Sequence, residues 1–337
     1  MLKDAIAKMA ASEDLGPGEA EAAMMEIMEG VATPAQVGAF LVASRMKGET
    51  MGEILGFARA IRAKAIPVGW GAGAVDVCGT GGDGAQTLNL STASAFVVAG
   101  AGVPVVKHGN RSFSSRCGSA DVLEELGIDI TMEPETAGRC LEETGMTFLF
   151  APVYHRAMRY VSGPRTELGL RTVFNLLGPL CNPSGVKAQV VGVYAQDLTG
   201  RVAEALAALG TTHAMVVHSL DGLDEISAAA PTQVSEIKDG RMKTYLIDPR
   251  ELGLQASRDS VAGKDAKANA EALMSILMGD PLPARDWVLL NAAAGLVVGG
   301  AAGDLREGIA LGERAIVTGA ALDTLLAMRR FSQEVVR

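Results

Sequence analysis

The 337-residue sequence contains few cysteines, few aromatic side chains and no apolar run long enough to cross a membrane. Its four cysteines are Cys78, Cys117, Cys140 and Cys181. They form no Cys-x-x-Cys pair, so neither a disulfide framework nor a zinc site is indicated. His213 and His218 would point to opposite faces of a predicted strand, which makes them a poor metal-binding pair. Because aromatic residues make up only 4% of the chain, aromatic stacking platforms are not expected either.

Basic residues are outnumbered by acidic ones, and the formal net charge is −9. Binding to a nucleic-acid backbone relies on clustered Lys and Arg, so a nucleic-acid partner is not expected. The longest apolar stretch, residues 287–302, includes Asn291 and is shorter than the ~20 residues that a membrane helix requires. The N-terminus is amphipathic and soon acidic, unlike a signal peptide. We therefore expect a cytoplasmic protein with no membrane contact.

The hydrophobic pattern predicts helices first and then an alternation of strands and helices. The four predicted N-terminal helices are 2–11, 18–29, 34–46 and 50–64. The predicted strands that follow are 75–78, 103–107, 128–130 and 147–150, with helices at 91–100, 118–126 and 134–144. This alternation is typical of a parallel sheet. The N-terminal helices carry more methionine and alanine than one small domain can readily bury, which indicates a homodimer formed through this region.

The alternation stops at residue 151 and resumes at residue 189. The intervening segment predicts helices at 157–161 and 165–177. The later predicted elements are strands 189–195 and 212–218, helix 199–209, a hairpin of strands 232–237 and 243–247, and helices from 267 onward. The expected fold class is α/β, with a small all-helical domain and a larger α/β domain around a mostly parallel sheet. The expected domains are 1–70 with 152–186 (helical) and 71–151 with 187–337 (α/β).

A glycine-rich segment follows the first predicted strand, and residues 79–84 are called the glycine loop below. Four glycines lie within six residues: Gly79, Gly81, Gly82 and Gly84. Such a turn can expose backbone N–H groups to an anion. Asn89, Ser91 and Thr92 follow as candidate N-caps at the start of a helix, where the dipole favours phosphate. The spacing matches neither G-x-G-x-x-G nor a P-loop, and a purely structural glycine turn fits an isolated loop of this kind equally well.

A second polar segment begins at the last residue of the next predicted strand. It offers Lys107, His108, Asn110 and Arg111 together with hydroxyls at 112, 114, 115 and 119. Two such loops on consecutive strands favour a phosphate-bearing ligand. A third segment, after strand 212–218, contains Asp221, Asp224 and Glu225. A solvated acidic turn is the alternative, but next to phosphate loops these carboxylates favour a magnesium site, since Mg²⁺ prefers oxygen ligands.

Three motifs in order, Cys-Gly-Thr-Gly-Gly-Asp (78–83), Asn-Leu-Ser-Thr (89–92) and Lys-His-Gly-Asn-Arg (107–111), resemble the anthranilate phosphoribosyltransferase family. The resemblance covers nearly the whole chain. It implies a nucleoside phosphorylase/phosphoribosyltransferase-type fold with the active site in a hinge cleft, and a homodimer formed through the helical domain. It also implies transfer of a phosphoribosyl group from 5-phosphoribosyl 1-pyrophosphate to the amine of anthranilate in tryptophan biosynthesis. A glutamine amidotransferase partner is left open.

The resemblance implies three sets of site residues. Those for phosphoribosyl pyrophosphate are Gly79, Gly82, Asp83, Thr87, Asn89, Leu90, Ser91, Thr92, Lys107, Ser115 and Ser119. Those for anthranilate are Gly79, His108, Asn110 and Arg165, with His108 also a candidate proton acceptor. Those for two magnesium ions are Ser91, Asp224 and Glu225.

The sequence departs from the family pattern in two places. Cys117 stands where serine is common, and Gly163-Pro164 replaces the usual Pro-Val before Arg165, which affects how that arginine enters the site. The alternative functions are a pyrimidine-nucleoside phosphorylase-like enzyme and a non-catalytic relative that binds nucleic acid. The acidic segment argues against the first, and the net charge of −9 argues against the second.

Overall fold

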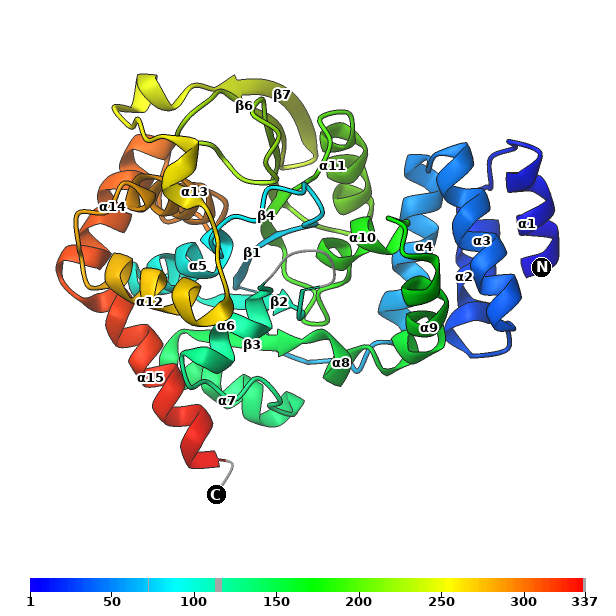
Figure 1. Cartoon of the computed structure of the whole chain (residues 1–337), viewed down its shortest axis with the longest axis horizontal. Coiled ribbons are helices and arrows are strands. Elements are labelled where there is room, and N and C mark those ends of the chain that lie inside the picture. The colour runs from blue at the N-terminus through cyan, green and yellow to red at the C-terminus, as the bar shows by residue number, and fades with distance from the viewer. Residues whose placement is uncertain (72, 113–116, 336–337) are drawn as a thin grey trace.

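The computed structural model describes residues 1–71, 73–112 and 117–335. A group of helices forms one end of the molecule, and an α/β body forms the rest (Figure 1). The N-terminal helices are α1 (Leu2–Ala10), α2 (Pro17–Met28), α3 (Pro34–Lys47) and α4 (Met51–Lys64). All four predicted N-terminal helices are therefore confirmed.

The start of α4 shows why the chain folds as it does here. The Thr50 hydroxyl accepts a hydrogen bond from the Glu53 N–H at 3.3 Å, and the Glu53 carboxylate accepts one from the Thr50 N–H at 2.9 Å, which satisfies two N-terminal donors of the helix. Glu53 is buried, and it also accepts hydrogen bonds from the Leu15 N–H and the Lys47 ammonium. Through Glu53, the N-terminus of α4 is therefore hydrogen-bonded to the segment before α2 and to the end of α3.

The α/β body is built on a seven-stranded sheet with strand order β3-β2-β1-β4-β5-β6-β7. The strands are β1 (Val75–Gly79), β2 (Val105–Gly109), β3 (Met146–Phe150), β4 (Ala188–Gly192), β5 (His213–Ser219), β6 (Thr232–Lys238) and β7 (Arg241–Ile247). The first five in the order β3 to β5 are parallel, and β6 and β7 are antiparallel. The predicted hairpin is confirmed, with Asp239 and Gly240 at positive φ in its turn.

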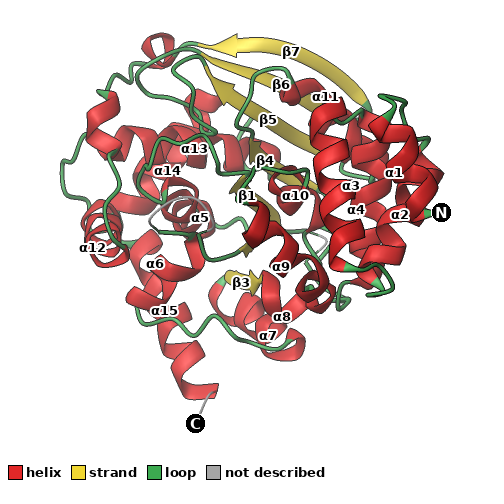
Figure 2. Cartoon of the chain, turned by 45° about the vertical axis from the view of Figure 1, so that its right-hand side comes forward, coloured by secondary structure: helices red, strands yellow, loops and turns green. Residues whose placement is uncertain are grey.

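Helices cover both faces of the sheet (Figure 2). Those of the α/β body are α5 (Leu90–Gly100), α6 (Ser119–Glu125), α7 (Pro134–Thr144), α11 (Leu198–Ala208), α12 (Ala266–Leu277), α13 (Ala284–Val298), α14 (Leu305–Val317) and α15 (Ala320–Val335). Between β3 and β4 the chain forms α8 (Ala151–Tyr154), α9 (Arg159–Leu168) and α10 (Phe174–Leu177). Of these, α9 packs against α3 of the N-terminal group (Figure 2).

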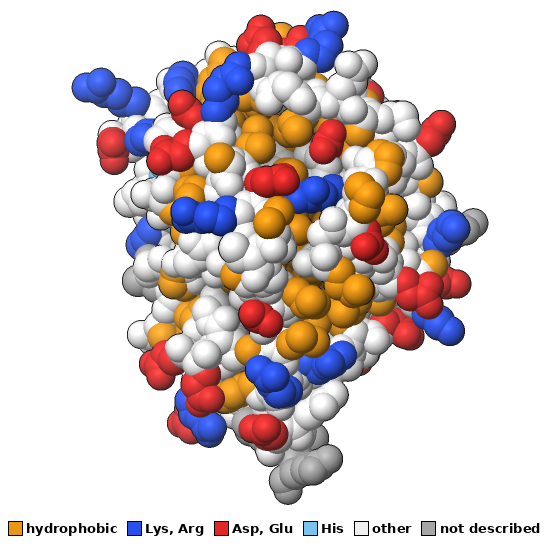
Figure 3. Space-filling model, turned by 90° about the vertical axis from the view of Figure 1, so that its left-hand side faces the viewer, with side chains coloured by type: hydrophobic (Ala, Val, Ile, Leu, Met, Phe, Trp, Pro, Cys, Tyr) orange, Lys and Arg blue, Asp and Glu red, His pale blue; other side chains and the backbone are white. Residues whose placement is uncertain are grey.

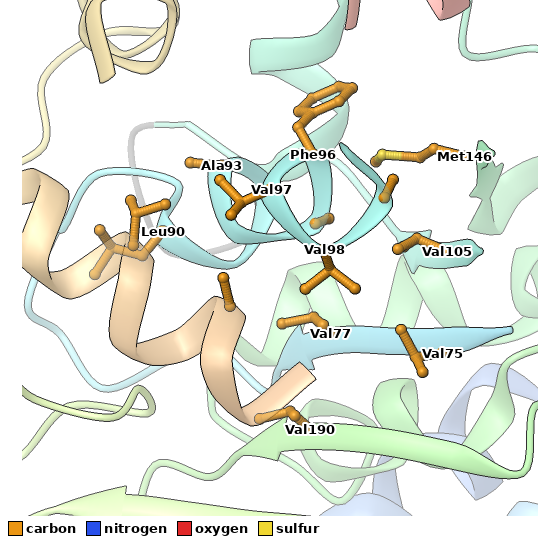
Figure 4. Close-up of a cluster of buried hydrophobic side chains, with 14 of the residues drawn as sticks. Val75, Val77, Leu90, Ala93, Phe96, Val97, Val98, Val105, Met146 and Val190 are labelled. Atoms are coloured by element: carbon orange, nitrogen blue, oxygen red, sulfur yellow. The ribbon is translucent and has the colours of Figure 1, made fainter. Parts of the chain in front are cut away.

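The main core lies where α5 packs on β1 and β2 (Figure 4). Phe96 and Val98 of α5 and Val77 of β1 are almost completely buried. Helix α13 lies beside α5, and a Cβ on its Gly295 would come within 2.7 Å of Val98. A second apolar cluster joins α1–α4 and α10 to the opposite face of the sheet beneath α11. The helical end and the sheet therefore share buried surface.

Two sequence predictions of secondary structure are wrong. Residues 128–130 form no strand, although Ile128 and Ile130 are buried. The Ile128 N–H donates to the Leu123 carbonyl and the Asp129 N–H to the Ser332 hydroxyl of α15, because β3 already occupies the place beside β2. The predicted helix 165–177 is interrupted at Gly169, whose φ of 58° ends α9.

The surface of the α/β body carries apolar side chains as well. Figure 3 shows the face at the left of Figure 1, away from α1–α4, where hydrophobic side chains gather among charged ones. Met278 and Val317, at the ends of α12 and α14, are strongly exposed. None of the helices in the described part of the chain has the length and apolarity needed to span a bilayer.

Candidate active site

A cavity of about 710 Å³ opens where the carboxyl ends of β1 and β2 face the segment α8–α10. Ligands of α/β proteins bind outside the carboxyl ends of parallel strands, because loops from neighbouring strands converge there. Here the loops after β1, β2 and β5 meet residues of α9 and α10. The three polar segments singled out in the sequence therefore line one cavity.

The glycine loop is shaped by its glycines and by Asp224. Gly81, Gly82 and Gly84 have φ between 61° and 76°, where side chains are disfavoured. The Gly81 N–H donates to the Asp224 carboxylate at 2.6 Å. A Cβ on Gly79 would lie 2.5 Å from the Asp224 Oδ2, so the absence of a side chain at 79 allows the acidic segment to approach.

A buried cation lies beneath the start of α5. The Lys107 ammonium donates to the Val77 carbonyl at 2.6 Å and to the Ser91 hydroxyl at 3.1 Å, and its side chain is almost completely buried. Asn89 occupies the N-cap position, but its side chain contacts Cys117 and Asn269 instead of capping the helix, contrary to the sequence prediction. The N-terminus of α5 and a buried ammonium thus face the same space, which suits an anion.

The segment after β2 differs from the sequence prediction in one respect. The Arg111 guanidinium pairs with Asp121 at 3.0 Å and with Glu124 of α6, so it is not the unopposed donor that the sequence indicated. Asn110 lies at the cavity and accepts the Arg111 N–H at 2.8 Å. Ser119 also lines the cavity, whereas the predicted ligand residue Ser115 lies outside the described residues.

Two histidines, His108 and His155, line the cavity. The His108 Nδ1 lies 3.3 Å from the Gly178 carbonyl, and its ring centroid is 5.0 Å from that of His155. Burial, together with the neighbouring His155, lowers the pKa of His108 to about 3, and burial lowers the pKa of His155 to about 4. Both rings are therefore neutral at pH 7. His155 is a cavity residue that was not predicted from the sequence, although it lies five residues after the last residue of a predicted strand.

The acidic segment divides into two parts. Asp221 accepts hydrogen bonds from the Ser219 and Ser227 hydroxyls and stabilises its own turn. Asp224 and Glu225 instead line the cavity. Burial and the nearby Asp83 raise the pKa of Asp224 to about 7, and burial and Asp224 raise the pKa of Glu225 well above its usual value.

These carboxylates fit a magnesium ion. Asp83 adds a buried Oδ2 with no hydrogen-bond partner among the described residues, so a third carboxyl oxygen lies near Asp224. Within the described residues, no set of three or more His, Cys, Asp or Glu side chains could hold a metal without help. Mg²⁺ usually binds one or two carboxylates plus water and substrate phosphates, so a partial ligand set is the expected arrangement.

The structure shows what the two departures from the family pattern do at Arg165 and at Cys117. Arg165 lies in α9 after Pro164, and the helix continues through that proline. Arg165 lines the cavity and its guanidinium lies 5.3 Å from the centroid of the Phe174 ring, so Gly163 and Pro164 do not remove this residue from the site. Cys117 is buried, and burial raises the pKa of its thiol to about 11, which keeps it protonated.

The remaining predicted site residues lie at the same cavity. They are Gly79, Gly82, Asp83, Thr87, Leu90, Ser91 and Thr92. The structure therefore brings together every sequence-predicted site residue that it describes.

Comparison with known proteins matches both parts of the chain. Residues 71–322 match the model of the glycosyl transferase family, a/b domain, and residues 3–65 match that of the glycosyl transferase family, helical bundle domain. A curated anthranilate phosphoribosyltransferase of Desulforamulus reducens is 52% identical, covering 100% of this chain and 98% of its own length.

Solved structures are similar over the same extent. The crystal structure of anthranilate phosphoribosyltransferase from Thermus thermophilus aligns with a TM-score of 0.91 and 41% identity, covering 98% of this chain and 99% of that one. The enzyme from Saccharomyces cerevisiae in complex with PRPP and Mg aligns with a TM-score of 0.89 and 29% identity, covering 99% and 98%. The similarity thus spans the helical end and the α/β body together.

Proposed function

The chain belongs to the anthranilate phosphoribosyltransferase family, and on that premise we propose that it transfers the phosphoribosyl group of phosphoribosyl pyrophosphate to the amine of anthranilate. The products are N-(5-phosphoribosyl)anthranilate and pyrophosphate, and the reaction serves tryptophan biosynthesis. The observation that carries the proposal is one cavity in which two phosphate-type loops, the carboxyl groups of Asp224 and Glu225, and Arg165 converge.

We propose that the phosphoribosyl pyrophosphate lies against the glycine loop and the start of α5. Backbone N–H groups there, the hydroxyls of Ser91 and Thr92, and the Lys107 ammonium are donors suited to phosphate oxygens. The proposed ligand residues are Gly79, Gly82, Asp83, Thr87, Asn89, Leu90, Ser91, Thr92, Lys107, Ser115 and Ser119. Similarity to the yeast enzyme bound to PRPP and Mg supports this assignment.

We propose Ser91, Asp224 and Glu225 as the residues that hold two magnesium ions, directly or through water. When bound, magnesium supplies charge neutralisation for the pyrophosphate leaving group. The protein's own part is to hold the buried Asp224 carboxyl beside the glycine loop, where Gly79 leaves room for it and the Gly81 N–H donates to it. The Lys107 ammonium lies 3.1 Å from the hydroxyl of Ser91, the third proposed ligand.

Anthranilate is assigned to the side of the cavity formed by α9 and the loop after β2. A guanidinium can bind a carboxylate with two parallel hydrogen bonds, and Arg165 is the candidate, with Gly79, His108 and Asn110 as further contacts. An aromatic amine is unprotonated at neutral pH and needs no strong base. Because the pKa of His108 is about 3, we assign it to contact with anthranilate rather than to proton abstraction.

The direct test is a fluorescence assay of the purified protein. Anthranilate fluorescence should fall when phosphoribosyl pyrophosphate and Mg²⁺ are added together, and it should stay constant when either is omitted. A constant signal with all components present would reject the proposed function.

We also propose a homodimer formed through the N-terminal helices. Met46 and Val31 there are 84% and 70% exposed, which is unusual for large apolar side chains. A partner copy would bury them.

A further inference from the structure

Arg171 lies in the turn between α9 and α10 and has no role in the site described above. Its guanidinium donates a hydrogen bond to the carbonyl of Gly82, in the middle of the glycine loop. It also stacks on the Tyr194 ring, with 4.2 Å from Cζ to the ring centroid. Gly82 belongs to the described residues that line the cavity, and Arg171 does not.

The guanidinium also covers the face of Gly82 that lacks a side chain. A Cβ built on Gly82 would lie 3.5 Å from the Arg171 Nε and 3.8 Å from its Cζ, which is ordinary van der Waals contact. Gly82 has a φ of 75°. Arg171 therefore holds this left-handed residue by packing as well as by a hydrogen bond.

The two ends of the glycine loop are held from the α/β body. At the near end, the Thr80 N–H donates to the Gly192 carbonyl at 2.9 Å, and the Tyr194 N–H donates to the Thr80 hydroxyl at 3.1 Å. Beyond the far end, the Gly263 N–H donates to the Gln86 carbonyl at 2.7 Å. The contact of Arg171 with Gly82 differs because it comes from the helical side of the cavity.

Arg171 is itself tied to the N-terminal helices. The Arg45 guanidinium of α3 donates to the Arg171 carbonyl at 2.7 Å. A continuous line of contacts thus runs from α3 through the Arg171 turn to the loop that lines the cavity. Tyr194, on the α/β side, supports the guanidinium from its flat face.

We propose that Arg171 is a positioning residue for the pyrophosphate end of the substrate: it fixes the glycine loop through the Gly82 carbonyl and links that loop to the helical domain. This rests on the function proposed above. A planar guanidinium can stack on a ring and donate in its own plane at once, whereas an ammonium cannot do both. The role therefore depends on arginine and not only on positive charge.

The test compares Arg171→Ala and Arg171→Lys in the full-length protein. Loss of a hydrogen bond from a charged donor should raise the KM for phosphoribosyl pyrophosphate about tenfold in Arg171→Ala, while the KM for anthranilate changes less than about twofold. Arg171→Lys should recover part of the loss. Tyr194→Leu should raise the same KM, and Tyr194→Phe, which keeps the ring, should not.

Arg201→Ala is the matched control. Arg201 of α11 is also an exposed arginine that joins the α/β body to the helical end, donating to the Glu49 carbonyl at 3.2 Å, but its described contacts do not include the glycine loop. Its removal should leave the KM for phosphoribosyl pyrophosphate unchanged. If Arg201→Ala and Arg171→Ala shift that constant equally, or if Arg171→Ala lowers only the melting temperature, the inference is overturned.

A measurement without substrate separates this inference from the proposed function. Hydrogen–deuterium exchange of the peptide covering residues 79–88 should be faster in Arg171→Ala than in the wild type and in Arg201→Ala. Equal exchange in all three proteins overturns the inference while leaving the proposed function standing. Absence of wild-type turnover together with faster exchange in Arg171→Ala would instead reject the proposed function and keep the link between Arg171 and the loop.

Discussion

Asp224 and Glu225 are proposed magnesium ligands, and replacing their side chains tests that role directly. In the double variant Asp224→Asn, Glu225→Gln, we expect activity to fall at least about 100-fold, because the proposed magnesium ligands lose their charge. We expect no loss of melting temperature without magnesium, because burial already raises the pKa of both carboxyl groups and so disfavours their charged forms. Steady-state rates and thermal melting measure the two effects.

Asp221→Asn provides the control from the same segment. Asp221 holds its turn through Ser219 and Ser227, so its change should lower the melting temperature and leave the magnesium dependence intact. A double variant with wild-type activity and wild-type magnesium dependence would contradict the metal assignment.

Arg165 distinguishes the two substrates. Arg165→Ala should raise the KM for anthranilate about 10- to 100-fold, the range for a charge-assisted hydrogen bond, and should change that for phosphoribosyl pyrophosphate much less. Arg165→Lys should recover only part, since lysine cannot form two parallel hydrogen bonds. Initial rates with each substrate varied in turn measure this split. Equal effects on both constants would point to cavity closure instead.

The sequence alone indicated which polar side chains lie near the ends of strands, but it did not indicate which groups they contact. Lys107 ends one predicted strand and Asp224 follows another, and parallel topology brings such positions together. The pairing of Arg111 with Glu124 depends on how α6 packs against the loop before it. The contact of Arg171 with Gly82 joins two loops that lie far apart in the chain. No local pattern encodes those choices, so they required the structure.

The bounds of most helices and strands were predicted within a few residues. The exceptions are segments whose apolar residues are buried for a reason other than the expected helix or strand. Ile128 and Ile130 alternate like a strand because both are buried, yet no place beside β2 was free. At Gly169 the chain leaves the helical conformation, and this break brings Arg171 out toward the glycine loop. Hydrophobic periodicity can be recognised within a short stretch of sequence, whereas competition between segments for one edge of a sheet cannot.

The antiparallel edge of the sheet contains a polar cluster on β5, β6 and β7. Burial opposes ionisation of Glu236, but contacts with His213, Lys243 and Tyr245 at 2.8, 3.0 and 2.9 Å outweigh it and lower the pKa of this carboxyl to about 2. A carboxyl whose pKa is lowered by folding stabilises the fold above its unfolded pKa of ~4.3. That contribution is lost as the pH falls from there toward about 2.

We therefore expect Glu236→Gln to lose less stability than the wild type between about pH 4.5 and pH 2, and to be less stable at pH 7. Urea midpoints at a series of pH values measure the difference. Glu204→Gln, an exposed position on α11, should follow the wild-type pH dependence. If Glu236→Gln follows it too, the cluster does not stabilise the fold through this carboxylate.

For the molecule as a whole, the proposed dimer predicts that Met46→Glu yields monomers. A charge at this strongly exposed position of α3 would be buried against the partner copy without a counter-charge. Light scattering at micromolar concentration gives the mass directly. Met278→Glu, on the α/β body away from α1–α4, is the control and should leave the dimer intact. A wild-type monomer, or dissociation by Met278→Glu instead, would contradict the proposed interface.

All four cysteines are buried, and this has a practical consequence for following the molecule in solution. Burial raises the pKa of Cys117 and Cys140 to about 11 and that of Cys181 to about 12, and it also raises that of Cys78, so almost no thiolate exists at neutral pH. Thiolates are the form that reacts with maleimides. The native cysteines should therefore react only very slowly with a maleimide dye. Two surface cysteines, one on α2 and one on α15, could carry a donor and an acceptor dye that report how the helical end moves against the sheet, with every native cysteine retained.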